Sequence, residues 1–98
     1  MSTINITIDI INKKGLHARA AAKFVKVVTS YTAQVTAKKL GQAEEEETPS
    51  VVGSSILGLL MLGADPGSKL YITAEGDQAE EVINALKELI DNCFGEPQ

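Results

Sequence analysis

The sequence has little of what a disulfide framework, a metal site or a base-stacking surface requires. Its 98 residues include one cysteine, one histidine, four residues with tyrosine or phenylalanine rings and no tryptophan. Cys93 alone cannot form an intramolecular disulfide, and one histidine without nearby ligands specifies no metal site. Because aromatic residues make up only 4% of the chain and none cluster on a predicted strand, RNA binding through stacked bases is disfavoured.

Long hydrophobic runs are also missing, so the sequence predicts no membrane span. No N-terminal segment shows the charged and then apolar pattern of a secretory signal. Together with the single cysteine, these features predict a cytoplasmic protein. A length of 98 residues, 44% hydrophobic and 22% charged, predicts a single globular domain over residues 1–98.

The charges are distributed unevenly. The net charge of −4 disfavours nonspecific binding to nucleic acid. The four-glutamate run from Glu44 to Glu47 ends near Pro49 and predicts an exposed loop. Positive side chains gather instead around His17, and we call them the basic cluster: Lys13, Lys14, Arg19, Lys23 and Lys26. This cluster suits an acidic protein partner or a phosphate.

Hydrophobic periodicity predicts the order strand, helix, strand, short strand, helix, strand, helix. Alternation with period two marks strands around residues 4–10, 33–37 and 70–74, whereas helical spacing marks residues 20–31, 55–62 and 77–94. Residues 50–52, just before Gly53, are expected to form a short strand, although periodicity over so few residues decides little. Asp77 and Glu80 predict a capping box at the start of the last helix. This order predicts an α+β sandwich, with three helices on one face of a mainly antiparallel four-stranded sheet.

The second predicted helix is apolar on nearly every side. Ser54 and Ser55 are its N-cap candidates, and Gly58 would allow close approach to a neighbouring element. The helix is either fully buried or partly exposed as a docking surface, and a domain this small has difficulty enclosing a helix on all sides. Both alternatives remain open. Our candidates for partner binding are Leu57, Leu60, Met61 and Lys23.

His17 lies where the first strand gives way to the first helix, just after Gly15. Backbone N–H groups at a helix start lack intrahelical partners, and the helix dipole favours anions there. Arg19 opposes that dipole with no acidic residue nearby, and a bound anion would resolve the conflict. Since an imidazole titrates near neutral pH, it can act as a nucleophile whose phosphoryl adduct Arg19 would help to hold. The residues indicate a phosphorylation site; the alternative is a polar N-cap beside a solvated arginine.

Two segments resemble a known family. Residues 15–25, GLHARAAAKFV, resemble the active-site segment of HPr, the histidine phosphocarrier of the bacterial phosphotransferase system, and the likeness continues through residues 55–62, SILGLLML. The resemblance implies an HPr-like open-faced sandwich without a cofactor. It also implies that His17 accepts a phosphoryl group from phospho-Enzyme I and passes it to a IIA domain, with Arg19 assisting. Such a protein is a stoichiometric carrier, not an independent enzyme. Ser55 matches the serine that a regulatory kinase phosphorylates in some members.

Three features depart from the family pattern. Ala20 replaces a proline that often follows the arginine, which is similar to NPr, the nitrogen-branch paralogue. Lys14 stands where a small polar residue is common, and the acidic loop is longer than the usual turn, which leaves strand pairing there open. Sugar uptake and nitrogen-linked regulation both remain open. A non-catalytic module that senses an anion or docks a partner is the alternative, and it differs in leaving His17 unphosphorylated.

Overall fold

The computed structural model describes residues 2–40 and 50–96, and the predicted acidic loop at Glu44 to Glu47 lies outside them. The elements follow the predicted order, with one additional 3-10 turn at the end. They are β1 (Ser2–Asp9), α1 (Ala18–Thr29), β2 (Gln34–Lys39), β3 (Val51–Val52), α2 (Ile56–Met61), β4 (Lys69–Gly76), α3 (Ala79–Asp91) and η1 (Cys93–Gly95).

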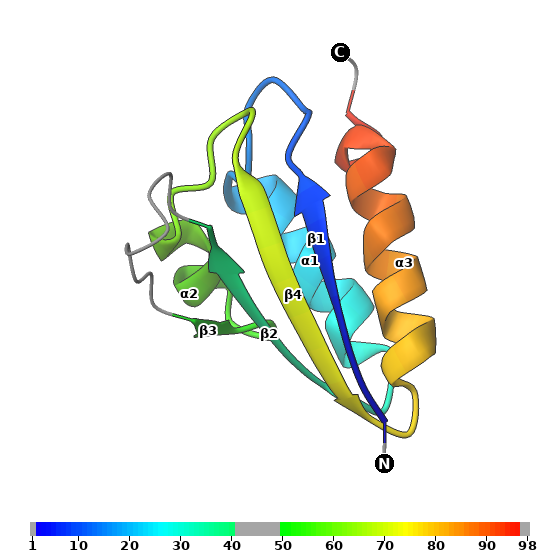
Figure 1. The fold of residues 1–98 in the computed structure, drawn as a ribbon. Helices are drawn as coiled ribbons and strands as arrows, with labels where there is room; N and C mark the ends of the chain where they lie inside the picture. The colour runs from blue at the N-terminus through cyan, green and yellow to red at the C-terminus, as the bar shows by residue number, and fades with distance from the viewer. Residues whose placement is uncertain (1, 41–49, 97–98) are drawn as a thin grey trace.

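The four strands form one antiparallel sheet in the order β1-β4-β2-β3. Ile72 at the centre of β4 pairs with Ile6 on one side and Ala37 on the other. The short strand β3 does pair with β2, through Thr36 with Val52 and Ala37 with Val51. The helices lie on one face of this sheet (Figure 1), so the predicted α+β open-faced sandwich is confirmed.

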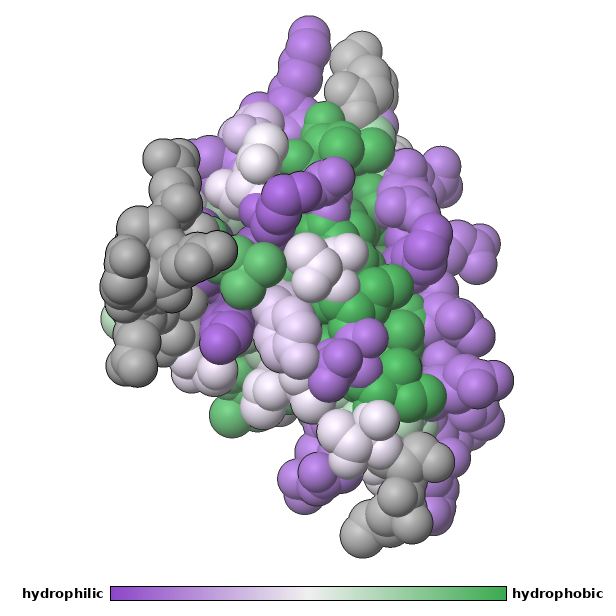
Figure 2. Space-filling view, in the orientation of Figure 1, coloured by the Kyte–Doolittle hydropathy of each residue, from purple (hydrophilic) through white to green (hydrophobic). Residues whose placement is uncertain are grey.

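The hydrophobic core lies between the sheet and helices α1 and α3. Alternate residues of β4 point into it, because successive side chains of a strand face opposite sides, and Leu70, Ile72 and Ala74 are fully buried. Phe24 of α1 and Leu86 of α3 pack into the same cluster. Hydrophobic side chains also show at the surface between β1 and α3, while the outer side of α3 is hydrophilic (Figure 2).

The sequence left open whether helix α2 is fully buried or partly exposed. In the structure it is partly exposed, because only Leu59 within it is buried. The side chains of Leu57, Leu60 and Met61 are 69%, 37% and 77% exposed. Gly58 allows the predicted close approach, since an added Cβ would lie 3.1 Å from the Cβ of Val51. The apolar composition of α2 therefore reflects an exposed apolar face, not complete burial.

The predicted capping box at Asp77 is wrong. Helix α3 begins at Ala79 after Gln78, which makes no side-chain cap hydrogen bond. Gln78 is instead held by Thr32: its Oε1 accepts from the Thr32 N–H at 2.7 Å, and its own N–H donates to the Thr32 carbonyl at 2.9 Å. This tether to the loop before β2 accompanies an N-cap at Gln78, one residue later than the predicted cap at Asp77.

Within residues 2–40 and 50–96, no helix has the length and apolar character needed to cross a membrane.

Candidate functional site

The loop between β1 and α1 is pinned to the segment that follows α2. Gly15 adopts a φ of 65°, a conformation that residues with side chains rarely adopt, and an added Cβ would lie 2.5 Å from the Ala64 carbonyl oxygen. The next residue, Leu16, donates its N–H to that same carbonyl at 2.9 Å. The start of α1 is therefore held beside the end of α2.

His17 is the N-cap residue of α1, with φ −87° and ψ −177°. Its carbonyl accepts the first intrahelical bond, from the Ala21 N–H at 2.8 Å, but its side chain makes no cap hydrogen bond. Among the described residues, the N–H groups of Ala18, Arg19 and Ala20 consequently have no acceptor. These donors, with the positive end of the helix dipole, form a site suited to an anion.

Arg19 adds an exposed positive charge to this helix start. Its side chain is exposed, and the first turn of α1 contains no acidic residue. Within the part of the chain that the structure describes, its guanidinium makes no ion pair or hydrogen bond. Arg19 therefore remains available for an anion bound at the start of α1.

The His17 ring turns away from its helix toward the C-terminal segment. Its Nε2 lies 2.5 Å from Oε2 of Glu96, and the two side chains are 25% and 11% exposed. The other carboxylate oxygen of Glu96 accepts from Nδ2 of Asn12 at 2.8 Å. Nδ2 of Asn12 also donates to the Gly15 carbonyl at 2.8 Å, which joins the carboxylate to the loop before α1.

These contacts determine the ionisation of Glu96. Partial burial favours its neutral form, but hydrogen bonds from Asn12 and His17, and then electrostatic interactions with His17 and Lys14, outweigh that effect and lower the pKa of the carboxyl below its ordinary value of 4.5. The carboxylate is therefore negatively charged at neutral pH and can only accept hydrogen bonds.

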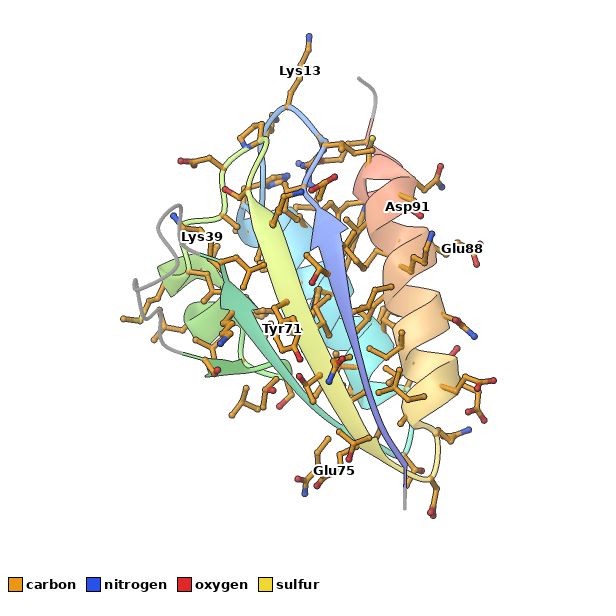
Figure 3. The ribbon with its side chains drawn as sticks, in the orientation of Figure 1. Lys13, Lys39, Tyr71, Glu75, Glu88 and Asp91 are labelled. Carbon is orange, nitrogen blue, oxygen red and sulfur yellow. The ribbon has the colours of Figure 1, made fainter. Side chains whose placement is uncertain are left out.

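The basic cluster is divided in the structure. Lys14 lies near enough to Glu96 to favour its charged form, whereas Lys13 projects away from the body of the protein (Figure 3). Lys23 is half-buried, and its Nζ donates to the Phe94 carbonyl at 2.5 Å. Lys26 is exposed in the last turn of α1. Only part of the cluster therefore surrounds the histidine closely.

Of the two serines predicted as candidates for the N-cap of α2, Ser55 is the one that caps the helix. Its hydroxyl oxygen accepts from the Gly58 N–H at 3.0 Å. Ser54 is exposed and lies outside the helix. The predicted capping role of Ser55 is thus confirmed, and its regulatory role stays a prediction.

Sequence reasoning missed Asn12 and Glu96. Glu96 is 79 residues from His17 in the chain, and no spacing rule connects the two. Asn12 precedes Gly15 closely enough to suggest a turn, but nothing local indicates that its amide holds a distant carboxylate. Elsewhere in the described residues, no group of three or more His, Cys, Asp or Glu side chains could hold a metal ion.

Comparison with known proteins agrees with this geometry. The family model described as "PTS HPr component phosphorylation site" matches residues 4–92. The phosphocarrier protein HPr of Pseudomonas aeruginosa is 48% identical over 91 residues, which cover 93% of this chain and 94% of that protein. HPr of Pseudomonas putida is 44% identical over 89 residues, 91% of this chain and 92% of that protein.

Among solved structures, the fold is similar to the crystal structure of HPr-C-His from Thermoanaerobacter tengcongensis. The TM-score is 0.84 at 39% sequence identity, and the match covers 97% of this chain and 99% of that chain. The family model matches most of the chain, and the relatives are covered almost end to end. The fold is shared as well, and in this chain His17 lies at the open start of a helix. The chain belongs to the HPr family, the phosphocarrier proteins of the phosphotransferase system.

Proposed function

We propose that His17 carries the phosphoryl group, accepting it from phospho-Enzyme I and passing it to a IIA domain. The observation that supports this assignment most directly is the open start of α1, where His17 caps no N–H group and three backbone donors have no acceptor in the described residues. A phosphoryl group on the ring would be stabilised there by the helix dipole and by Arg19. The protein thereby acts as a stoichiometric carrier.

Both partners dock, in this proposal, on the exposed face of α2 beside the start of α1. Leu57, Leu60 and Met61 provide the apolar contacts, and the bond from Leu16 to Ala64 holds this face next to the histidine. Lys23 contributes its positive charge at the edge of this surface. Because its ammonium group already contacts Phe94, it acts through its electrostatic field.

Ser55 is the proposed regulatory position. A phosphate at a helix N-terminus is compatible with the dipole, so modification by a serine kinase would leave α2 folded. The added negative charge would lie on the surface that a partner contacts and would oppose docking.

The proposed location is the cytoplasm, which the single buried thiol of Cys93 supports. Within the phosphotransferase system, Ala20 after Arg19 favours the nitrogen branch over sugar uptake, because of its similarity to NPr.

Incubation with phosphoenolpyruvate and purified Enzyme I paralogues of both branches tests these assignments. We expect one phosphoryl group per chain, labile in acid and stable in alkali as a phosphoramidate should be, with faster labelling by the nitrogen-branch donor. Faster labelling by the sugar-branch donor would reverse the assignment of branch. No incorporation from any paralogue would instead favour the non-catalytic anion-sensing or docking module.

A further inference from the structure

Strand β1 forms one edge of the sheet. It pairs with β4 on one side and, among the residues that the structure describes, with no strand on the other. The Ile10 N–H donates to the Ser68 carbonyl at 2.8 Å, and consecutive residues of a strand direct their backbone groups to opposite sides, so even-numbered residues of β1 face β4. The N–H and carbonyl groups of Thr3, Asn5 and Thr7 therefore face outward, and within the described part of the chain they have no hydrogen-bond partner.

Nothing in β1 blocks pairing at this edge. Proteins protect exposed edge strands with proline, lysine, bulges or a short length. β1 is 8 residues long, its pairing with β4 runs without interruption from Ser2 to Asp9, and it contains neither proline nor lysine. The opposite edge of the sheet is β3, which has only 2 residues. β1 is therefore the edge with a length of backbone that another strand can pair with.

Hydrophobic side chains lie beside this edge on the helical face of the sheet, and we call them the apolar strip. Ile4 and Ile6 of β1 and Leu89 of α3 are half-buried residues that pack against the core. Figure 2 shows hydrophobic side chains at the surface between β1 and α3, next to the hydrophilic outer side of α3. Every second side chain of a strand added to β1 would face the apolar strip, because successive side chains point to opposite sides.

The charges beside the edge are mainly negative. Helix α3 carries one exposed lysine, Lys87, and four exposed acidic residues, Glu80, Glu81, Glu88 and Asp91. Lys87 is already paired with Asp91 at 2.6 Å, and Glu88 and Asp91 project from the outer side of the helix (Figure 3). A second copy paired edge to edge about a twofold axis would bring its own acidic α3 to the same place. Charge complementarity therefore favours a basic partner over a second copy.

We propose that the β1 edge is a docking site for an extended, basic segment of another protein in which every second side chain is apolar. The segment adds a strand to the sheet by pairing with the outward backbone groups of Thr3, Asn5 and Thr7. Its apolar side chains cover the apolar strip, and its cations are attracted by α3. In this mode of recognition the main-chain hydrogen bonds supply affinity and the alternate side chains supply specificity.

This site is separate from the surface proposed for phosphoryl transfer. Helix α2 packs beside β3, at the opposite edge of the sheet from β1. The two surfaces also differ in charge, because the basic cluster lies near the start of α1 and the β1 edge is flanked by the acidic α3. The chain can therefore hold a basic segment at β1 while a phosphotransfer partner contacts α2.

Asn5→Pro tests the proposal in the full-length protein. It removes an outward N–H without removing a hydrogen bond to β4, and proline is tolerated on an edge strand when its nitrogen faces outward. Asn5→Ala is the matched control, since it loses the same side chain and keeps the N–H. The probe is an eight-residue peptide that alternates valine with lysine, and its counterpart alternates valine with glutamate. Calorimetric titration measures binding, and thermal melts establish that each variant is folded.

We expect the wild type and Asn5→Ala to bind the lysine peptide equally, and Asn5→Pro to bind it roughly tenfold more weakly. Equal binding by folded Asn5→Pro would overturn the proposal, because all three proteins have the same charge and only the edge differs. The glutamate peptide should bind the wild type at least roughly tenfold more weakly than the lysine peptide. Equal affinity for the two peptides would overturn the basic character of the partner.

Amide hydrogen exchange in the wild type decides the question without any variant. The lysine peptide should slow exchange at the N–H groups of Thr3, Asn5 and Thr7 by roughly tenfold, because they become hydrogen-bonded. Unprotected amides at these three residues would contradict docking at the β1 edge. Sedimentation of the protein without peptide tests the second copy as occupant. We expect a monomer, and a dimer that Asn5→Pro abolishes would assign the edge to self-association and overturn the choice of partner.

Discussion

Helices α1 and α2 begin in similar extended backbone but use their first side chains in opposite ways. At α2 the Ser55 hydroxyl accepts from the Gly58 N–H and closes the helix start. At α1 the His17 ring contacts Glu96 and leaves the first turn open. A closed start contributes to stability, whereas an open one is available to an anion. This difference is the basis of our proposal that phosphoryl transfer takes place at α1 and that partners dock on α2.

The largest expected effect is on phosphate incorporation, and it distinguishes the N-cap residue of α1 from that of α2. His17→Ala should abolish phosphate incorporation from phospho-Enzyme I and leave α1 intact, because no cap hydrogen bond is lost. Ser55→Ala is its counterpart: labelling should be unaffected, while loss of the cap should cost about 1 kcal/mol of unfolding free energy. Thermal denaturation and a labelling assay on both variants measure the two effects. Normal labelling of His17→Ala would refute the assignment of the phosphorylation site.

Arg19→Ala should slow labelling by roughly tenfold, because it removes a charge-assisted contact to the phosphoryl group from the open start of α1. Its melting temperature should stay close to that of the wild type, since the side chain is exposed. Lys26→Ala, also exposed and on the same helix but in its last turn, controls for the loss of one positive charge. Equal rates for the two variants would show that Arg19 acts only through the overall charge.

Leu57→Gln and Met61→Gln should each weaken Enzyme I binding by about fivefold, the effect of losing roughly 1 kcal/mol of interface contact. Stability should change little, because both side chains are exposed. Leu59→Ala provides the contrast, since Leu59 is fully buried and its truncation should cost about 2 to 5 kcal/mol of unfolding free energy. Calorimetric titration with Enzyme I measures the binding. A large loss of stability at Leu57 or Met61 would remove them from the docking surface.

Ser55→Asp should slow labelling by about threefold, because it places a negative charge on the proposed docking face of α2. The variant should melt no lower than the wild type, since an aspartate can cap a helix and interacts favourably with its dipole. Stopped-flow transfer rates and thermal melts distinguish the two effects. An unchanged rate would eliminate the regulatory role of Ser55.

The smallest expected effect is on the pH dependence of stability. The folded-state pKa of Glu96 is lowered, so its contribution is fully present above its ordinary value of 4.5 and is lost as the pH falls through the lower folded value. Asn12, His17 and Lys14 are the groups that favour the charged form. The melting temperature of the wild type should therefore decline relative to Glu96→Gln between about pH 5 and pH 3. Parallel curves for the two proteins would contradict this contribution.

Much of the fold could be predicted from local patterns, because the alternation in β4 and the helical spacing of α1 match the faces that the core buries. The position of His17 followed from the break at Gly15, and Ser55 was one of two N-cap candidates for the second helix. The start of α3 could not be predicted, since contacts with Thr32 override the local signal at Asp77. The contact between Glu96 and His17 could not be predicted either, because a strained turn brings Glu96 to His17 from the other end of the chain.

The most direct test locates the phosphoryl group on the labelled wild-type protein. Mass spectrometry under alkaline conditions identifies the modified residue, and ¹H–¹⁵N spectra before and after labelling identify the amides that respond to the new charge. We expect modification of His17 and the largest shifts at the N–H groups of Ala18, Arg19 and Ala20, with the Gly58 N–H in the closed start of α2 almost unchanged. A phosphoryl group on any other residue, or unchanged amides in the first turn of α1, would contradict the account.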